Sequence, residues 1–553
     1  MFKKIKILLL ALLLVPIVSC NEEFLERTPT DAIAAGDALA NEANMQLVLN
    51  GVHRGLFSQS QTVFPGGNTA RANNHFWVPM GDNLAGELIH SASANNLGWR
   101  TTMQWNDHTI PTSLTNELLW YHRYNIILHA NLLINGIENG GLTMTEGLNR
   151  ILGQAYTYRA YAYLSLVQHY GRGYLIGNPA TDLGVPLLFS SESPFTSEAR
   201  STVQEIYDQI ELDLDAAIAA FAAGGDNGSG SGGASPAAKM QLNANAAHGI
   251  KARWALSKGD WQTAADEAVA ARQGYPLLSE GDWKSGFNSN GLSEVIWGSN
   301  VIETETTFFR SYFYLASNTF NGSQIRNNPK IADRRLVDAI PDTDFRKDVF
   351  LPDAPNSNTS AANGEGGWDN NTNPLYTTEE EFDAAIADIK STYGLVSGHN
   401  THPYMHFKLK QANPGTIDPD DVIYMRSSEM YLVEAEAKAM MNDIIGAQQA
   451  LDALVSTRDS AFDATVFIDQ TSLMDEIKFQ WRVEMWGEGF GYTNKIRWDE
   501  GIDHAADGGS GASSVLYQGA YQIERPSVND DWIFKIPQAE IDANPNIGPG
   551  DQN

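Results

Sequence analysis

Three neighbouring histidines, His399, His402 and His406, are the closest approach to a metal-binding cluster in the sequence. Imidazole nitrogen is a common ligand of zinc, which needs several ligands on one face of its site. Pro403 prevents one continuous helix from aligning the three rings, and the letters PYMHFKLK around it are typical of a strand. We therefore interpret the segment as a loop that leads into a strand.

Paired carboxylates are a second pattern that could do chemistry, because two acids can share the acid and base steps of glycoside hydrolysis. Glu434 with Glu436 and Asp213 with Asp215 are such pairs. The chain has 67 acidic residues, so close pairs are expected by chance. We interpret these pairs as solvated helix faces and predict that the protein is not an enzyme.

A glycine-rich tract, GGDNGSGSGGASP at residues 224–236, contains the G-x-G-x-x-G order of a dinucleotide-binding loop. That loop must follow a strand and open a helix. No strand pattern precedes this tract, and further serine and glycine residues surround its three key positions. We therefore interpret it as a flexible connector between two helical segments.

The overall composition excludes several classes of protein. The 553 residues include 37 basic and 67 acidic side chains, which gives a net charge of −30. A nucleic-acid-binding surface needs clustered cations, so we exclude nucleic acid as a partner. One cysteine is too few for a disulfide framework or a cysteine-based metal site.

The one cysteine, Cys20, closes an N-terminal segment that has the composition of a secretion signal. Three lysines precede an apolar run at residues 7–15, which is too short to span a membrane as a helix. The tetrad Ile-Val-Ser-Cys resembles a bacterial lipobox, in which residues 1–19 are removed and the cysteine is acylated, as with palmitate. We expect residues 20–553 to be one domain, attached to the membrane through lipid only. The alternative is an ordinary signal peptide in which Cys20 has no role.

The acidic pair Glu22-Glu23 follows this cysteine directly. It resembles the export signal that directs lipoproteins of Bacteroidota to the outer face of the outer membrane. The expected location is therefore the outer membrane, facing the cell exterior.

Aromatic side chains are the residues that would bind a sugar, because flat rings stack on its C–H groups while polar groups bond its hydroxyls. Most of the thirteen tryptophans fall in predicted helices, strands or core elements. Four of them fall in polar contexts that we interpret as loops: Trp77, Trp99, Trp105 and Trp368.

Two stretches combine aromatic rings with hydrogen-bonding side chains. In SASANNLGWRTTMQW, Asn96 and Arg100 lie beside Trp99, and in FFRSYFYLASNTFNG, Phe309 and Tyr312 precede asparagines. The residues that we expect to contact a ligand are Trp99, Trp77, Asn96, Arg100, Tyr312 and Phe309.

Helical periodicity dominates the elements that must position these residues. Apolar side chains recur three or four residues apart over 151–169, before Gly171, and again over 118–133. Two further segments each predict a helix, a tight turn and a second, alanine-rich helix: KARWALSKGDWQTAADEAVAA and VEAEAKAMMNDIIGAQQALDAL. This pattern is typical of a tetratricopeptide hairpin. We predict a mainly α fold, a tetratricopeptide-like helical-repeat scaffold with a loop-rich lobe and short strands near 294–299 and 404–410.

Several segments, taken in their order, resemble the SusD/RagB-like nutrient-binding outer-membrane lipoproteins. They are EEFLERTPTDAI, YRAYAYLSLVQHYG followed by GVPLL, KGDWQTAADEA, MRSSEMYLVEAEAKAM and KIPQAEIDANPNIG. The resemblance extends from Cys20 to about Ile547. The chain departs from the family where Gln480-Trp481 replaces a Glu-Arg pair and Gly491 replaces an arginine. We therefore expect a rebuilt ion-pair network at this place.

The resemblance implies a binding function. Members of the family cover a SusC-like TonB-dependent transporter, capture an oligosaccharide or peptide, and pass it into the barrel. No cofactor is implied, although some relatives hold a structural calcium ion; this chain has no D-x-[DN]-x-[DN]-G calcium loop. We predict a glycan ligand. The alternatives are a peptide or other non-sugar nutrient, for which a charged pocket would argue, and a helical-repeat adaptor with no ligand.

Overall fold

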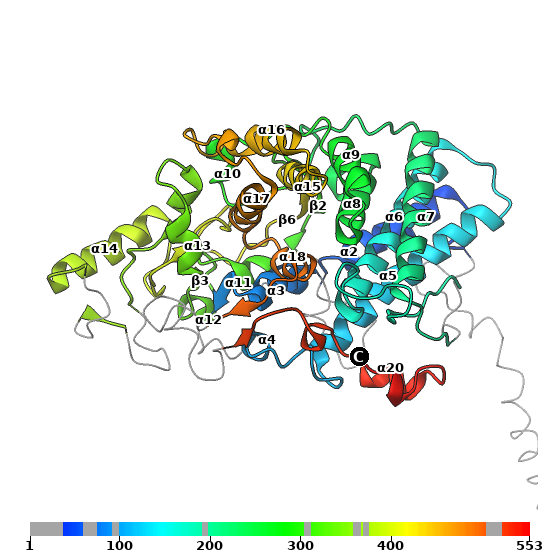
Figure 1. Cartoon of the computed structure of the whole chain (residues 1–553), viewed down its shortest axis with the longest axis horizontal. Coiled ribbons are helices and arrows are strands. Elements are labelled where there is room, and N and C mark those ends of the chain that lie inside the picture. Colours follow the sequence, from blue (N-terminus) through cyan, green and yellow to red (C-terminus); the bar gives the residue numbers. More distant parts are fainter. Residues whose placement is uncertain are drawn as a thin grey trace, which may run out of the picture.

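Helices dominate the described part of the chain and follow one another in a row, as the apolar periodicity predicts (Figure 1). The computed structural model describes residues 37–58, 74–90, 99–190, 197–303, 311–357, 366–368, 375–504 and 523–553. The helices of the row are α5 (Leu114–Asn139), α6 (Glu146–Tyr170), α7 (Val203–Ala223), α8 (Ala244–Lys258), α9 (Trp261–Ala271), α15 (Ser427–Met440), α16 (Ile444–Val455) and α17 (Gln470–Glu484). Each contacts the next, and α9 contacts α15 across the long insertion between them.

The two predicted helical hairpins, α8–α9 and α15–α16, are confirmed, with the same construction at the turn. Gly259 and Asn442 have positive φ angles of 81° and 61°, a conformation that glycine and asparagine adopt at low cost. The next residue in each case, Asp260 or Asp443, caps the second helix by accepting a backbone N–H bond. Alanines on the facing sides are fully buried, so the helices pack closely.

The insertion between α9 and α15 forms the loop-rich lobe, whereas α2 (Glu42–Gly55) and α20 (Gln538–Ala543), near the chain ends, lie toward α5 (Figure 1). Its short helices and those near the termini are α2 (Glu42–Gly55), α3 (Asn74–Ala85), α4 (Trp99–Met103), α10 (Glu280–Trp283), α11 (Tyr312–Ala316), α12 (Ser323–Arg326), α13 (Arg334–Ala339), α14 (Glu379–Thr392), α18 (Gly491–Trp498) and α20 (Gln538–Ala543). Figure 1 shows α14 at the far end of this lobe. The tract 224–236 connects α7 to α8, so it follows a helix, as the connector interpretation requires.

Short antiparallel strands join distant parts of the chain. They are β1 (Leu88–His90), β2 (Val295–Ser299), β3 (Lys330–Ala332), β4 (Phe350–Leu351), β5 (Met405–His406), β6 (Val422–Arg426), β7 (Ile502–Asp503) and β8 (Glu524–Arg525). One sheet has the order β1-β3-β5-β4, while β2 pairs with β6, placing Val295 opposite Arg426. The predicted strands near 294–299 and 404–410 are therefore present, the second only as β5.

The loop interpretation of Trp77 and Trp99 is wrong, because Trp77 lies within α3 and Trp99 opens α4. Trp105 does lie in a turn, but it is only 2% exposed and packs edge-on against Trp532 at 4.7 Å. The local sequence around Trp105 is polar, and its aromatic partner comes from a distant segment, which a local pattern does not reveal.

The interpretation of the acidic pairs as solvated faces is also wrong for three of the four residues. Asp213 is 1% exposed and accepts two hydrogen bonds from Arg159. Glu434 and Glu436 are buried against arginines of other helices. Asp213 joins α7 to α6, Glu434 joins α15 to the end of α9, and Glu436 joins α15 to α18.

The histidine segment forms a loop and a strand, as predicted. His399 and His406 hold their Nε2 atoms 3.1 and 2.8 Å from backbone carbonyl oxygens. Among the residues described above, no group of three or more His, Cys, Asp or Glu side chains is arranged to hold a metal ion. Within the same residues, no helix is long and apolar enough to cross a membrane.

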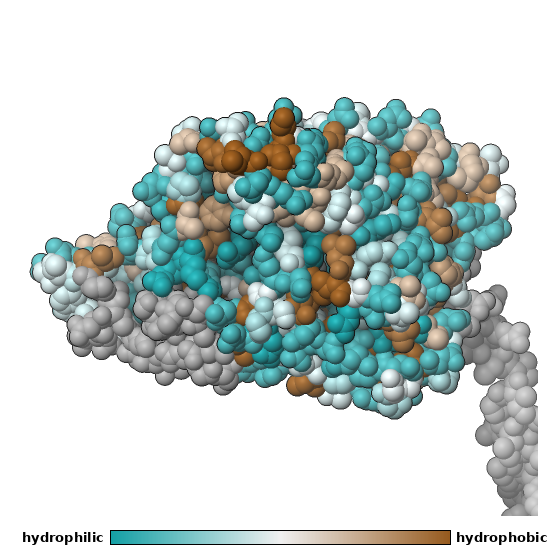
Figure 2. All heavy atoms as spheres, in the orientation of Figure 1, coloured by the Kyte–Doolittle hydropathy of each residue, from teal (hydrophilic) through white to brown (hydrophobic). Residues whose placement is uncertain are grey.

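The outer surface matches the strongly acidic composition. Figure 2 shows that hydrophilic residues cover most of one face and that hydrophobic side chains gather at its upper edge, around α16. Ile445 of α16 is 68% exposed.

Candidate functional site

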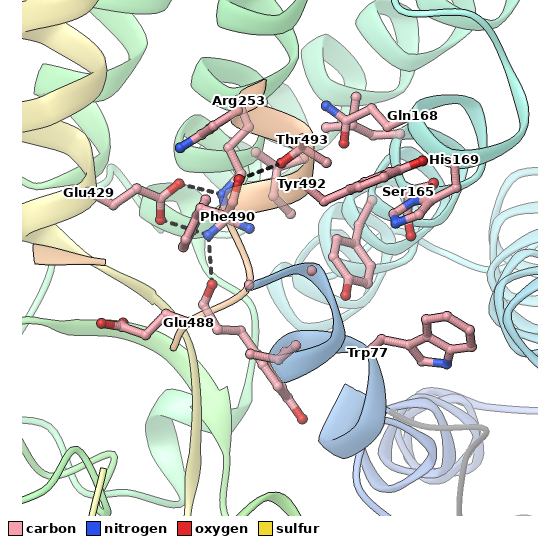
Figure 3. Close-up of a pocket in the computed structure, with 18 of the residues that line it drawn as sticks. Trp77, Ser165, Gln168, His169, Arg253, Glu429, Glu488, Phe490, Tyr492 and Thr493 are labelled. Atoms are coloured by element: carbon pink, nitrogen blue, oxygen red, sulfur yellow. Dashed lines mark hydrogen bonds and ion pairs between the residues drawn. The ribbon is translucent and has the colours of Figure 1, made fainter. Parts of the chain in front are cut away.

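A pocket of about 170 Å³ lies where the helical row meets α3 and α18. Its walls come from α3, α5, α6, α8, β6, α15, α17 and the segment that leads into α18. In Figure 3, Arg253 and Glu429 lie on one side, the α6 residues lie on the other, and Tyr492 and Phe490 lie between them. The pocket therefore combines aromatic, amide, hydroxyl and charged groups.

One face of α6 supplies a hydrogen-bonding wall. Tyr161, Ser165 and Gln168 recur at helical spacing, so they line the same side. His169 follows them, and its ring stacks on Tyr492 with ring centroids 5.7 Å apart. Burial lowers the pKa of His169 to about 4, so its imidazole is neutral near pH 7.

The opposite wall is a tight loop that presents Phe490 between two glycines. Asp82 of α3 accepts hydrogen bonds from the backbone N–H groups of Gly489 and Gly491, at 2.7 and 2.8 Å. A Cβ atom on Gly491 would approach Ala85 and Asp82 to less than 3 Å. Glycine at position 491 thus allows this loop to lie directly on α3.

Arg253 of α8 forms the charged side of the pocket. Its Nε and Nη2 atoms pair with both oxygens of Glu429 at 2.6 and 2.7 Å, and Nη2 also donates to the Tyr424 carbonyl. The guanidinium lies 5.2 Å from the centre of the Phe490 ring, within range of a cation–π interaction. The pair fixes both the ring and the charge in place.

A fully buried ion-pair network lies behind the pocket, where the sequence predicts one. Glu488, which lines the pocket, accepts hydrogen bonds from Lys408 and Arg426. Arg426 also donates to Glu484, which accepts further hydrogen bonds from Arg346 and Arg458. Gln480 takes part as an acceptor for Arg346 at 2.6 Å. The network anchors strand β6, α17 and the Phe490 loop to one another.

Of the expected ligand residues whose side chains the structure describes, Trp77 lines this pocket and Tyr312 does not. Trp77 lines it and extends from α3 in Figure 3. Tyr312 is 4% exposed, donates its hydroxyl to the Gly487 carbonyl, and packs in the core. Trp99 and Arg100 are in α4. Cys20, Asn96 and Phe309 lie outside the described residues.

The sequence interpretation missed several residues of the pocket: Tyr161, Gln168, Arg123, Arg253 and Phe490. Two signals were available. Tyr161, Ser165 and Gln168 form a polar stripe on α6. The helix was predicted from the spacing of its apolar residues, which does not reveal this stripe. Phe490 stands in GEGFGY, where flanking glycines indicate a close approach of the backbone to another element.

Comparison with protein families identifies the chain. Residues 217–553 match the model of the SusD family, and residues 71–226 match a SusD-like model described as starch-binding and associating with the outer membrane. The first match covers more than half of the chain. The protein therefore belongs to the SusD family, which confirms the resemblance inferred from the sequence.

Solved structures share the fold along nearly the whole chain. A SusD-like carbohydrate-binding protein from Bacteroides vulgatus is 21% identical, with a TM-score of 0.67 over 92% of this chain and 97% of its own. A SusD superfamily protein from Bacteroides thetaiotaomicron is 22% identical, with a TM-score of 0.67 over 93% and 99%. Surface glycan-binding protein A from Bacteroides fluxus is 17% identical, with a TM-score of 0.59 over 91% and 96%. No curated protein matches the chain.

Proposed function

We propose that the protein binds oligosaccharide or polysaccharide and that the pocket described above contains a binding site. The observation that carries this proposal is the pairing of partly exposed rings, Tyr161 and Phe490, with the hydrogen-bonding side chains of Gln168 and Thr493 in one pocket. Rings of this kind stack on sugar C–H groups, while amide and hydroxyl groups bond sugar hydroxyls. Structural relatives described as carbohydrate-binding and glycan-binding proteins support the same ligand class.

Binding, and not hydrolysis, is the activity that the pocket supports. Its two carboxylates are Glu429, paired with Arg253, and Glu488, paired with Arg426 and Lys408. Arg253 donates to both oxygens of Glu429, and Arg426 and Lys408 hold the pKa of Glu488 below its usual value. Glycoside cleavage needs a carboxyl group that is free to pass a proton to the substrate, and both of these groups are engaged by cations.

The remaining parts of the proposal concern location and partner. An acylated Cys20 would hold the protein at the outer membrane with its binding surface outside the cell. There it would deliver its ligand to a SusC-like TonB-dependent transporter. Family membership and the lipobox-like sequence support these steps, and copurification of the transporter with the full chain would test them.

Affinity electrophoresis tests the binding proposal. The full chain in mild detergent is run through native gels that contain neutral or acidic polysaccharides, and retardation by at least one polymer is expected. A shallow site gives an affinity of about micromolar or weaker, which this method detects.

Variants of two tryptophans locate the site. Trp77→Ala should abolish retardation, Trp77→Phe should preserve it, and Trp261→Ala, outside the pocket, should have no effect. Unchanged retardation of a folded Trp77→Ala chain would place the ligand elsewhere, and Trp99→Ala would then test the α4 segment. Retardation by no polymer would refute the proposal.

A further inference from the structure

The pocket contains a buried cation that no carboxylate of the described residues neutralises. Arg123 of α5 lines the pocket and is 3% exposed. Its hydrogen bonds go to Ser165 Oγ at 2.9 Å, Asn74 Oδ1 at 3.0 Å and His122 Nδ1 at 2.8 Å. Its Nη2 atom has no hydrogen-bond partner among the residues that the structure describes.

All three partners of Arg123 are uncharged. Ser165 and Asn74 are neutral by chemistry. His122 holds its Nε2 atom 3.0 Å from the Gly55 carbonyl oxygen, so Nε2 carries the proton and Nδ1 is free to accept from Arg123. Burial and the nearby Arg123 lower the pKa of His122 to about 3, which keeps this imidazole neutral.

The other two arginines of the pocket have their own counter-charges. Arg253 pairs with Glu429, and Arg497 pairs with both oxygens of Glu436 at 2.8 Å. Segment 59–73, which precedes α3 and lies outside the described residues, contains no aspartate or glutamate. Among the described residues, Arg123 is thus a positive charge of the pocket without a carboxylate partner, in a chain whose net charge is −30.

A buried charge without a partner costs several kcal/mol, so its position at a pocket wall indicates a ligand that supplies the opposite charge. The Nη2 group of Arg123 has two N–H donors, which match an oxygen of a carboxylate or sulfate group.

We propose that this pocket selects acidic glycans and that Arg123 binds the carboxylate or sulfate group of a sugar residue placed against Tyr161. The inference rests on the proposed carbohydrate-binding function and names its substrate class. The Tyr161 ring lies 5.0 Å from the Arg123 guanidinium, so one sugar unit could contact ring and cation together. An acidic peptide could also neutralise Arg123, but it has no sugar ring to stack on Tyr161. The test therefore includes an acidic peptide as the alternative ligand.

Matched pairs of ligands test the charge requirement. The full chain in detergent is titrated calorimetrically with oligogalacturonate and its methyl ester, with a sulfated galactan oligosaccharide and its desulfated form, and with polyglutamate. At least one acidic sugar should bind ten or more times more tightly than its neutral counterpart, and added salt should weaken that binding.

Three variants separate Arg123 from general electrostatics. Arg123→Gln should remove the preference for the acidic member, and Arg123→Lys should retain part of it. Arg335→Gln, which removes an exposed cation outside the pocket, should leave it unchanged. Because Arg123→Gln removes an uncompensated buried charge, its thermal unfolding midpoint without ligand should equal or exceed that of the wild type.

The outcomes distinguish this inference from the proposed function. Equal binding of acidic and neutral sugars, or a preference that survives in folded Arg123→Gln, would overturn the inference and leave carbohydrate binding intact. Binding of polyglutamate alone would overturn both in favour of an acidic peptide ligand. If no sugar binds at all, both the inference and the proposed function are overturned.

Discussion

Glu484 is the centre of the buried ion-pair network, and Glu484→Gln should destabilise the protein more than any surface substitution. The side chain is fully buried, and its Oε1 atom accepts from Arg426 at 2.7 Å and from the Trp283 indole at 3.1 Å. Its Oε2 atom accepts from Arg346 at 3.0 Å and from Arg458 at 3.3 Å. Glutamine would place an NH₂ group against these donors and leave the network with one excess positive charge.

The magnitude follows from the burial of every partner. Arg346, Arg426 and Arg458 have fully buried side chains, so water cannot replace the lost carboxylate. Removal of one member of a buried ion pair typically costs about 3–5 kcal/mol. A loss of this size is a large part of the roughly 5–15 kcal/mol that stabilises a typical native protein.

Urea unfolding followed by the fluorescence of the thirteen tryptophans measures this loss. The control is Glu280→Gln, whose side chain is 59% exposed and pairs with Lys284 on the surface. This control should change stability by less than about 0.5 kcal/mol. A folded Glu484→Gln chain within about 1 kcal/mol of the wild type would refute the argument from buried charge.

The pH dependence of the same variant gives a second check. Burial tends to raise the pKa of Glu484, but Arg458, Arg426 and Arg346 together hold it well below the usual value of 4.5. The stabilisation is therefore complete above about pH 4.5 and is lost as the pH falls further. The difference between wild type and variant should be constant from pH 6 to 8 and should shrink in acid.

Four other substitutions test the packing and the loop. Gly259→Ala should destabilise by about 1–2 kcal/mol because of its positive φ angle, whereas Asn442→Gly should have little effect, both read from urea midpoints. Ala447→Leu should cost about 1–3 kcal/mol by overpacking the α15–α16 hairpin, seen as a lower thermal midpoint. Burial raises the pKa of Asp82 to about 7, against two opposing backbone hydrogen bonds, so stability should fall as pH rises from about 4 to 7. Asp82→Asn should then lose less stability between pH 5 and 8 than the wild type, by about 1–3 kcal/mol, and an equal loss in both would contradict this assignment.

Local patterns predicted the helical scaffold well because the signals of a helix are short in range. The apolar spacing and Gly171 placed α6, and Gly259-Asp260 and Asn442-Asp443 placed the two hairpin turns. A left-handed turn residue and an N-cap act within four residues of one another. Such local signals can be recognised in the sequence without knowledge of tertiary contacts.

The site was predicted poorly because its residues meet only through tertiary contacts. Arg253 and Glu429 are 176 residues apart, and Asp82 holds a loop 407 residues away. Trp105 lies in a turn as predicted, but its burial was not predictable because its partner, Trp532, comes from the other end of the chain. Burial and charge pairing depend on such distant partners, and a polar local context conceals them.

By itself, the sequence determined the helical-repeat class, the family and a ligand class implied by that family, since periodicity, turn residues and ordered motifs are encoded locally. The tertiary structure alone decided which aromatic rings share a pocket, which carboxylates are neutralised, and that Arg123 is not. The charge state of a site depends on the sum of all groups within a few ångströms. Only the folded chain brings those groups together.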